Sequence, residues 1–406
     1  MDGQNQSPTL DQLKKAIPPE CFVSSLTTSL LYLVRDVIYA TVLVALALQI
    51  DSIPSQSLRV VAWTLYMFAQ GCVGTGIWIL GHECGHGAFS KYEKVNDFLG
   101  WLTHSSLLVP YFSWKITHAR HHRYTGHITK DAVFVPETED DLKNHNVSRF
   151  NQLLDMAEET SIVTILRLLQ HQLMGWQLYL IFNLTAGKQS LPNGEKLEPR
   201  RDMSHFTMSS KLFLPSQKIL VAISDLGLLL TLGSLWLAAQ HLGYQKVALL
   251  YFGPYLWVHH WLGKTFLALP LLARALTITP SVAITYLHHT HPDVPHYTDE
   301  AWTYTKGALG TIDRSVGFIG RHFFHEIIDY HVVHHLFPRI PFYHAEEATK
   351  AILPLLGSQY VEAKEEWFMQ SLFSTFKSCQ YVAEKKGAQS SKGDGKLFWV
   401  IKGRSD

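Results

Sequence analysis

The amino-acid sequence predicts an all-α integral membrane protein with four transmembrane helices and a cytosolic helical cap. Hydrophobic residues make up 47% of the 406-residue chain, and they gather in long runs rather than in short amphipathic periods. A mostly polar stretch, residues 124–218, separates two early runs from two later ones and is predicted to form the cap. Histidines cluster beside the ends of the runs, which indicates a metal site where the spans meet the cap.

The long runs match the length of a membrane crossing, because about 20 helical residues span the roughly 30 Å hydrocarbon layer. The predicted spans are Leu26–Ile50, Val60–Leu80, Ile219–Ala239 and Val247–Leu287. Arg35 and Asp36 limit the embedded part of the first span or require snorkelling. The run Phe98–Trp114 is interrupted by a histidine and a proline, so we expect a re-entrant or interfacial segment there.

Three parts of the chain follow from this pattern. Residues 1–25 are polar and lack the features of a cleaved signal peptide, so we expect a cytosolic N-terminal segment. Residues 26–383 form the membrane domain, and residues 384–406 are predicted to be a flexible tail. Sequons at Asn5, Asn146 and Asn183 fall on the cytosolic side of this topology, so we expect no glycan on them.

Charge and cysteine content exclude two classes of protein. Lys and Arg (35) nearly balance Asp and Glu (34), so the net charge of +1 gives no basis for nucleic-acid binding. The four cysteines show no CxxC spacing, which argues against a zinc finger or a disulfide framework. We expect unpaired thiols in a reducing compartment.

Eight of the 23 histidines form three tight groups with spacings typical of metal-binding helices. The groups are HECGH with His82 and His86, HARHH with His118, His121 and His122, and HVVHH with His331, His334 and His335. Residues three and four apart share a helix face, so each group directs its imidazoles toward one point, and two metal ions could be held between the groups. One HxxxH pair is usually incidental, but three such groups are not expected by chance even in a histidine-rich chain.

These motifs resemble the three histidine boxes of membrane fatty acyl desaturases, and the resemblance covers nearly the whole chain. The stretches GHECGHGAFS, HHRYTGHITKDAVFVP, TYLHHTHPDVPHY and HVVHHLFPRIPFYHAEEAT are similar to fungal and plant enzymes that act on the methyl side of C18 chains. The resemblance implies that each box histidine is a di-iron ligand and that His289 supplies a further one. His288 occupies a position that is often Gln in such enzymes, and the choice between a direct functional role and that of a supporting or structural histidine is open.

The resemblance also implies an activity. Reduced iron would activate O2, two hydrogens would leave the acyl chain, and a cis double bond would form with release of water. The expected reactions are delta-12 insertion into oleoyl chains and omega-3 (delta-15) insertion into linoleoyl chains; Gly87 and His288 favour the second. The substrate would be a phospholipid or an acyl-CoA at the endoplasmic reticulum membrane, with the boxes on the cytosolic side of a multi-pass protein.

Electrons must come from another protein, because the chain has neither a GxGxxG dinucleotide loop nor the HPGG motif of a fused haem domain. The resemblance implies cytochrome b5 and its NADH-dependent reductase. Carboxylates near the boxes are candidates to orient the ligand imidazoles: Glu83, Glu326 and Asp329. Gly85 and Gly87 either leave room for the acyl chain or allow close helix packing.

One segment departs from the family pattern. All three boxes must face one side of the membrane, so an even number of crossings must separate the second box from the third. The fourth run is about twice the length of one crossing, and residues 263–281 are extra relative to the family. Without them the run suits a single crossing, so we hypothesise a translated intron or a gene-model error. A genuine segment would be a re-entrant hairpin or would disrupt the placement of His289.

Two other functions fit parts of this pattern. Hydroxylation, triple-bond formation or conjugation can occur on the same scaffold, and the sequence does not separate these reactions from desaturation. A membrane metal transporter would also be rich in histidine. Its ligands would line a conduit inside the spans, however, whereas the boxes here lie just beyond the span ends.

Overall fold

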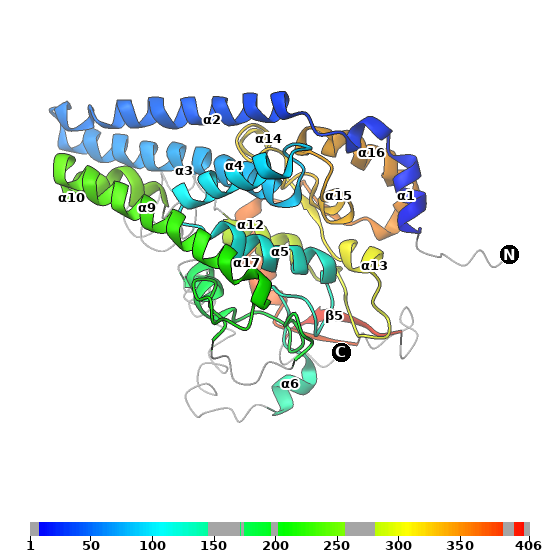
Figure 1. Cartoon of the computed structure of the whole chain (residues 1–406). Helices are drawn as coiled ribbons and strands as arrows, with labels where there is room; N and C mark the ends of the chain where they lie inside the picture. The colour runs from blue at the N-terminus through cyan, green and yellow to red at the C-terminus, as the bar shows by residue number, and fades with distance from the viewer. Residues whose placement is uncertain are drawn as a thin grey trace.

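The computed structural model describes residues 8–144, 171, 174–195, 202–255, 281–384 and 394–401, which are mostly helical. Long helices run side by side and end at a more compact part that contains shorter helices and small sheets (Figure 1). The helices are α1 Leu10–Ala16, α2 Leu26–Ala47, α3 Gln56–His86, α4 Glu93–Ser106, α5 Tyr111–Tyr124, α6 Glu139–Asn144, α9 Lys218–Leu242, α10 Tyr244–Val247, α12 Ser281–His289, α13 Tyr304–Ala308, α14 Phe318–His322, α15 His331–Leu336, α16 Ala345–Leu356 and α17 Phe368–Ser378. Short helical turns are η1 Pro19–Phe22, η2 Ile50–Ser52, η3 Pro215–Gln217, the π-helical η4 Ala248–Phe252, η5 Phe342–His344 and η6 Gly357–Gln359.

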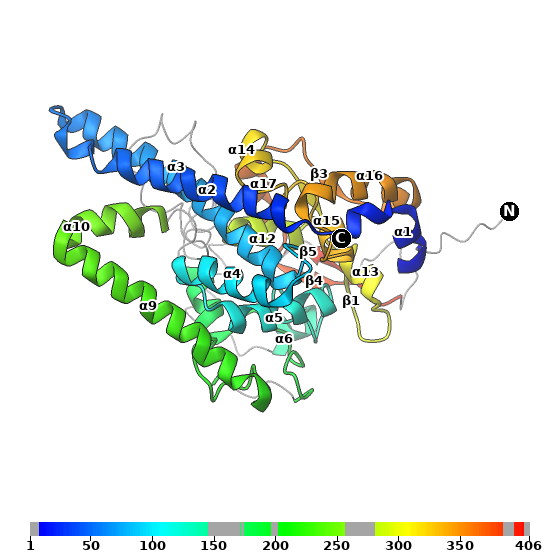
Figure 2. The same ribbon diagram turned by 45° about the horizontal axis from the view of Figure 1, so that its top comes forward.

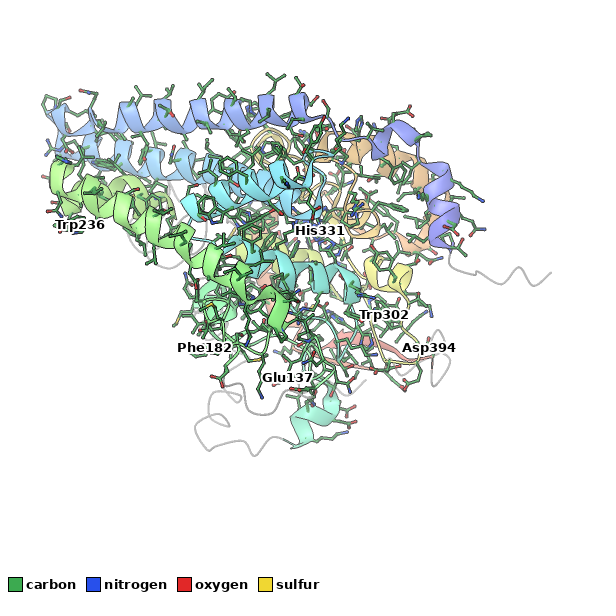
Figure 3. All side chains as sticks on the ribbon, viewed as in Figure 1. Glu137, Phe182, Trp236, Trp302, His331 and Asp394 are labelled. Atoms are coloured by element: carbon green, nitrogen blue, oxygen red, sulfur yellow. The ribbon has the colours of Figure 1, made fainter. Side chains whose placement is uncertain are left out.

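Three helical segments of the described chain are long and apolar enough to cross a membrane: Leu26–Ser52, Gln56–His86 and Pro215–Leu242. They match the first three predicted spans. Their outer surfaces carry large exposed apolar side chains, including Trp236 at the periphery of α9 (Figure 3). Such a surface is stable in lipid rather than in water. The chain is therefore a membrane protein.

The predicted fourth span, Val247–Leu287, is described only at its ends, by η4 and α12. Residues 256–280 lie outside the described residues, and with them nearly all of the extra segment 263–281. The sequons at Asn5 and Asn146 also lie outside, whereas Asn183 is described and its side chain is buried.

The three described spans lie close together at both of their ends. The α2–α3 turn meets α10, which directly follows α9, through an ion pair of 2.6 Å between Lys246 Nζ and Asp51 Oδ2. At the other end, α3 finishes in the first histidine group, and the start of α9 packs against α5 (Figure 2). All nine predicted metal ligands are therefore at one end of the spans and not along their length.

The charged pair inside the first span is explained by packing. Asp36 is buried, accepts a hydrogen bond from Arg35, and lies 2.8 Å from Nε2 of His325 in the turn before the third histidine group. Gly76 of α3 lies beside this contact, and a Cβ there would meet the Phe323 carbonyl oxygen at 2.4 Å. The first two spans and this turn form one tightly packed unit.

The run predicted as re-entrant, Phe98–Trp114, contains the end of α4 and the start of α5, with a break at residues 107–110. α4 packs between α3 and α9, as Figure 2 shows. At Gly100 of α4, a Cβ would meet the Tyr111 ring at 2.3 Å, so the two helices meet closely there.

The expectation of an all-α fold omitted two small sheets. One has the order β1-β5-β4, with β1 His296–Tyr297, β4 Tyr381–Ala383 and β5 Lys396–Val400; the other pairs β2 Asp313–Arg314 with β3 Glu362–Ala363 in parallel. β5 falls inside the predicted flexible tail, yet it pairs with both β1 and β4. Its sequence KLFWV is apolar enough to form a strand, a signal that the Lys-, Gly- and Ser-rich residues before it obscured.

Candidate metal centre

Four helices direct the predicted ligands into one interior region. The last turn of α3 carries His82 and His86, α5 carries the HARHH group, α15 carries the HVVHH group, and α12 ends at His289. α3 is capped by Gly87 in the left-handed conformation (φ 73°), so the chain turns away directly after the first group. His331 is buried, and Figure 3 places it in the interior of the molecule.

Five imidazoles form the first group, which comprises His82, His86, His118, His122 and His334. Each offers a nitrogen within 4.8 Å of the others. The Nε2 atoms of His86 and His82 are 3.2 Å apart, those of His118 and His86 are 3.1 Å apart, and those of His122 and His118 are 3.1 Å apart.

A second group lies beside the first and comprises His121, His289 and His335. Nε2 of His289 is 3.4 Å from that of His121 and 3.2 Å from that of His331, so His331 adjoins this group. The rings of His122 and His335 stack at 4.0 Å and join the two groups. The structure thus brings together all nine histidines named from the sequence.

This arrangement fits bound cations better than a hydrogen-bonded network. His121 directs Nδ1 at the Asp131 carboxylate, 2.7 Å away, so Nδ1 carries the proton and Nε2 presents a lone pair to His289. Other Nε2 atoms in these groups likewise face a neighbouring Nε2 rather than an ordinary acceptor, as ligand atoms around a shared cation would. A metal held by imidazoles at about 2.1 Å places neighbouring nitrogens about 3.0–3.4 Å apart, which matches the Nε2 spacings in both groups.

Burial supports neutral imidazoles. Desolvation, followed by the neighbouring imidazoles, lowers the pKa of the cap-side histidines well below the usual 6.5; these are His118, His122, His289, His331, His334 and His335. Metal binding requires the neutral form, so no proton has to be removed from these rings at neutral pH.

Three polar side chains lie beside ring nitrogens of the two groups, and sequence reasoning named only one of them. Glu83 was expected, but its Oε1 lies 3.5 Å from Nδ1 of His82 without a hydrogen bond, and its Oε2 accepts one from the Phe342 backbone instead. Asp131 holds His121, and the Thr125 hydroxyl lies 3.1 Å from Nδ1 of His335. Both follow α5 in the HHRYTGHITKD stretch, whose turn at Gly126 removes any helical spacing that could have identified them.

Two other carboxylates named from the sequence lie elsewhere. Asp329 accepts a hydrogen bond from the Ser315 hydroxyl at 2.8 Å. Glu326 is half-buried in the turn before α15, where burial and nearby carboxylates raise its pKa to about 7. Their positions in the sequence shortly before His331 predicted that both carboxylates lie near α15. The direction of each side chain was not predictable, because the left-handed backbone at His325 and Glu326 reorients the turn.

The small residues near the first box have packing roles. A Cβ on Gly85 would meet the Trp114 ring at 3.1 Å, and Gly87 provides the helix cap. His288 is buried, with its ring nitrogens 2.5 Å from the Ile284 carbonyl and 3.0 Å from the Ile328 carbonyl. These contacts favour the interpretation of His288 as a supporting or structural histidine.

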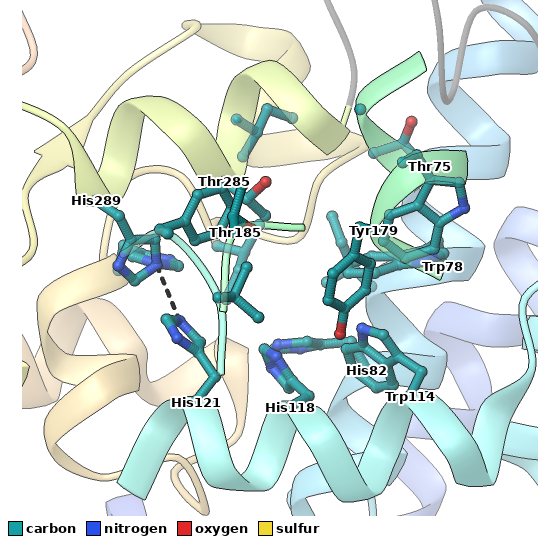
Figure 4. Close-up of a pocket in the computed structure, with 18 of the residues that line it drawn as sticks. Thr75, Trp78, His82, Trp114, His118, His121, Tyr179, Thr185, Thr285 and His289 are labelled. Carbon is teal, nitrogen blue, oxygen red and sulfur yellow. Dashed lines mark hydrogen bonds between the residues drawn. The ribbon is translucent and has the colours of Figure 1, made fainter. Parts of the chain in front are cut away.

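An apolar cavity of about 330 Å³ opens onto both histidine groups (Figure 4). His82 and His118 of the first group line it, together with His121 and His289 of the second. The remaining wall is mainly apolar or aromatic and includes Trp78, Ile79, Trp114, Val133, Phe134, Leu184 and Ile284. An aliphatic chain in this cavity would lie against both proposed metal positions with water displaced.

Comparison with known proteins adds independent information. Residues 58–367 match the model of the family described as fatty acid desaturase. An oleate hydroxylase from Claviceps purpurea is 38% identical over 96% of this chain and 80% of its own length. A delta(12) fatty acid desaturase from Mortierella alpina is 39% identical over 93% of this chain and 88% of its own. A delta(12)-fatty-acid desaturase from Arabidopsis thaliana is 37% identical over 96% and 91%, respectively.

Proposed function

The chain belongs to the fatty acid desaturase family and is an oxygen-dependent oxidoreductase, and we propose that it inserts a cis double bond on the methyl side of a C18 acyl chain. The observation that carries the proposal is the pair of imidazole groups at the wall of one apolar cavity. An unactivated methylene has no polar handle, so the oxidising centre must lie directly beside the buried chain.

We assign the nine histidines as ligands of two irons, five at the first position and His121, His289, His331 and His335 at the second. When bound, the irons supply the reduction of dioxygen and the strong oxidant that removes hydrogen. Asp131 and Thr125 orient the imidazoles of His121 and His335. The cavity wall binds the acyl chain by burial, about 0.8 kcal/mol per methylene, and keeps water from the reacting carbons.

Of the two regiochemistries, delta-12 insertion into oleoyl chains is the better supported. Two of the similar proteins are delta-12 desaturases. The features that favoured omega-3 insertion, Gly87 and His288, have packing explanations. The yeast assay described below tests both reactions.

Hydroxylation is the second candidate, because the oleate hydroxylase of Claviceps purpurea is as similar to the chain as the desaturases are. Both reactions begin with removal of hydrogen from a methylene, and they differ in whether a second hydrogen or an oxygen atom is transferred next. We further propose that the protein resides in the endoplasmic reticulum membrane with the histidine groups cytosolic, where cytochrome b5 donates the electrons.

Expression in yeast fed oleate or linoleate tests the function. We expect linoleate to appear from oleate, identified by locating the double bonds with gas chromatography and mass spectrometry. His118→Ala should abolish the product, whereas His241→Ala, at the far end of α9, should retain it. Ricinoleate-type hydroxy acids in place of linoleate would favour hydroxylation. No oleate- or linoleate-derived product from stably expressed protein would contradict the proposal.

A further inference from the structure

The N-terminal segment packs on the part of the molecule that follows the third histidine group. α1 and η1 both contact α16, and Figures 1 and 2 show α1 beside α16 at the end opposite the far ends of the spans. The buried side chains between them include Leu13 and Cys21 from the N-terminal segment and Val333 and Leu336 from α15. The segment therefore covers the back of the helix that carries His331, His334 and His335.

Three side chains with different metal-binding groups meet at this contact. The thiol of Cys21, the imidazole of His344 and the carboxylate of Glu347 each present one ligand atom within 4.8 Å of the others. Nδ1 of His344 is 3.7 Å from Oε2 of Glu347. A tetrahedral zinc ion with Zn–S of about 2.3 Å and Zn–N of about 2.0 Å places its ligand atoms about 3.3–3.6 Å apart.

The small adjustment needed to reach that geometry is available. Cys21 is buried and fixed, but the side chains of His344 and Glu347 are 27% and 53% exposed and can rotate. Their positions at the start of α16, three residues apart, place both on one helix face toward the thiol. The three ligands leave a fourth position open to solvent for a water molecule.

The local charge favours a cation. Burial and the Glu347 carboxylate raise the pKa of the Cys21 thiol to about 11, with a further contribution from Glu20. The raised pKa means that the thiol carries a proton when no cation is bound. A divalent ion would replace that proton and offset the surrounding carboxylates.

We propose that Cys21, His344 and Glu347 bind a divalent cation of zinc-like chemistry, which fastens the N-terminal segment to α16. The site shares no residue with the two histidine groups. The cation links the chain just before the first span to the helix just after the third histidine group. It thereby stabilises the packing of the N-terminal segment and α16 against α15.

Cobalt and zinc binding to the full-length protein in detergent tests the site. After removal of metals, Co²⁺ added to wild type should give a thiolate-to-cobalt charge-transfer band in the near ultraviolet. Cys21→Ser should lose the band, whereas Cys379→Ser, which alters another buried thiol, should keep it. His118→Ala should also keep it, because imidazoles alone give no thiolate band, so failure of the proposed iron site is scored separately.

His344→Ala provides a second variant if Cys21→Ser does not fold, because His344 is partly exposed. We expect it to weaken Zn²⁺ binding at Cys21 by at least about tenfold. Zinc should also slow tryptic cleavage after Lys14 and Lys15 in α1 of the wild type, and chelation should reverse this protection, whereas zinc should give no protection in Glu347→Gln. Absence of the band in wild type, or its persistence in Cys21→Ser, would overturn the proposal.

Discussion

Asp131 is the clearest case of a residue that carries no imidazole and yet determines how an imidazole points. Its Oδ1 lies 2.7 Å from Nδ1 of His121, and its carboxylate also accepts hydrogen bonds from the backbone of Gly126 and Val133. The carboxylate is thus fixed before it orients His121. In turn, Nε2 of His121 is directed at His289 and the proposed second metal position.

Replacing this carboxylate should weaken the second position. We expect Asp131→Asn to lower iron affinity by about 10–100-fold, since the amide keeps the shape but loses the charge that holds the Nδ1 proton. Elemental analysis of the purified protein and oleate conversion measure the effect. Asp140→Asn on the exposed face of α6 is the matched control. Full iron occupancy in Asp131→Asn would show that the contact does not support the ligand.

Glu326 gives a pH-dependent prediction. Its pKa is about 7 in the folded protein and 4.5 ordinarily, so between these values the native state keeps a proton that the unfolded chain releases. Stability contributed by this group therefore falls as pH rises from 4.5 to 7. Glu326→Gln should raise Tm by a few degrees at pH 8 and leave it unchanged at pH 4.5, because solvent screening limits the gain to about 1 kcal/mol.

Differential scanning fluorimetry of the purified protein at the two pH values makes this comparison. Glu365→Gln, at an exposed position, controls for loss of a negative charge. An equal shift in Tm at both pH values would mean that ionisation of Glu326 is not the cause.

The residues predicted from sequence were those related by helical spacing. His118, His121 and His122 share one helix, so their register alone placed them together. Asp131 and Thr125 were not predicted, because they follow the helix of the second histidine box in a turn. Glu326 and Asp329 were named by nearness along the chain, which does not determine direction across a turn with two left-handed residues.

At the scale of helices, the spans were predictable from length and apolarity, but their contacts were not. Gly76 shows why: the sequence contains many glycines in α3, and only the fold reveals that Gly76 faces the Phe323 carbonyl. The small sheets were missed for a related reason. Strands as short as two residues, such as β1 and β2, have no periodicity to detect.

A methyl group at Gly76 tests this packing. We expect Gly76→Ala to destabilise the protein by roughly 1–3 kcal/mol, because its Cβ would lie 2.4 Å from the Phe323 carbonyl oxygen. Gly233→Ala in α9 is the control, since nothing lies within 4 Å of its new Cβ. Thermal unfolding in detergent and bound iron report the outcome. Equal Tm values for the two variants would contradict the close contact between α3 and the turn before α15.

For the whole molecule, the side of the membrane that each end of the spans faces can be measured by labelling. All four native cysteines are buried, so new exposed thiols can be labelled selectively. In sealed microsomes, a membrane-impermeant maleimide should label Ser209→Cys, before α9, but label Ser57→Cys, at the start of α3, only after permeabilisation. Both positions are exposed serines, so the pair is matched. Labelling of Ser57→Cys in sealed vesicles would reverse the proposed orientation.

Each of the two histidine groups contains residues from both halves of the chain. The first needs His334 from beyond α12, and the second needs His121 from α5, while the stacked rings of His122 and His335 join them. Neither half of the sequence contains a complete set of ligands for either metal, so assembly of one position orders most of the other. Iron uptake by the metal-free protein should consequently be cooperative, with a Hill coefficient above one, and partly supplied protein should divide into filled and empty molecules. Independent filling of the two positions in an iron titration would show that the halves come together before the metal does.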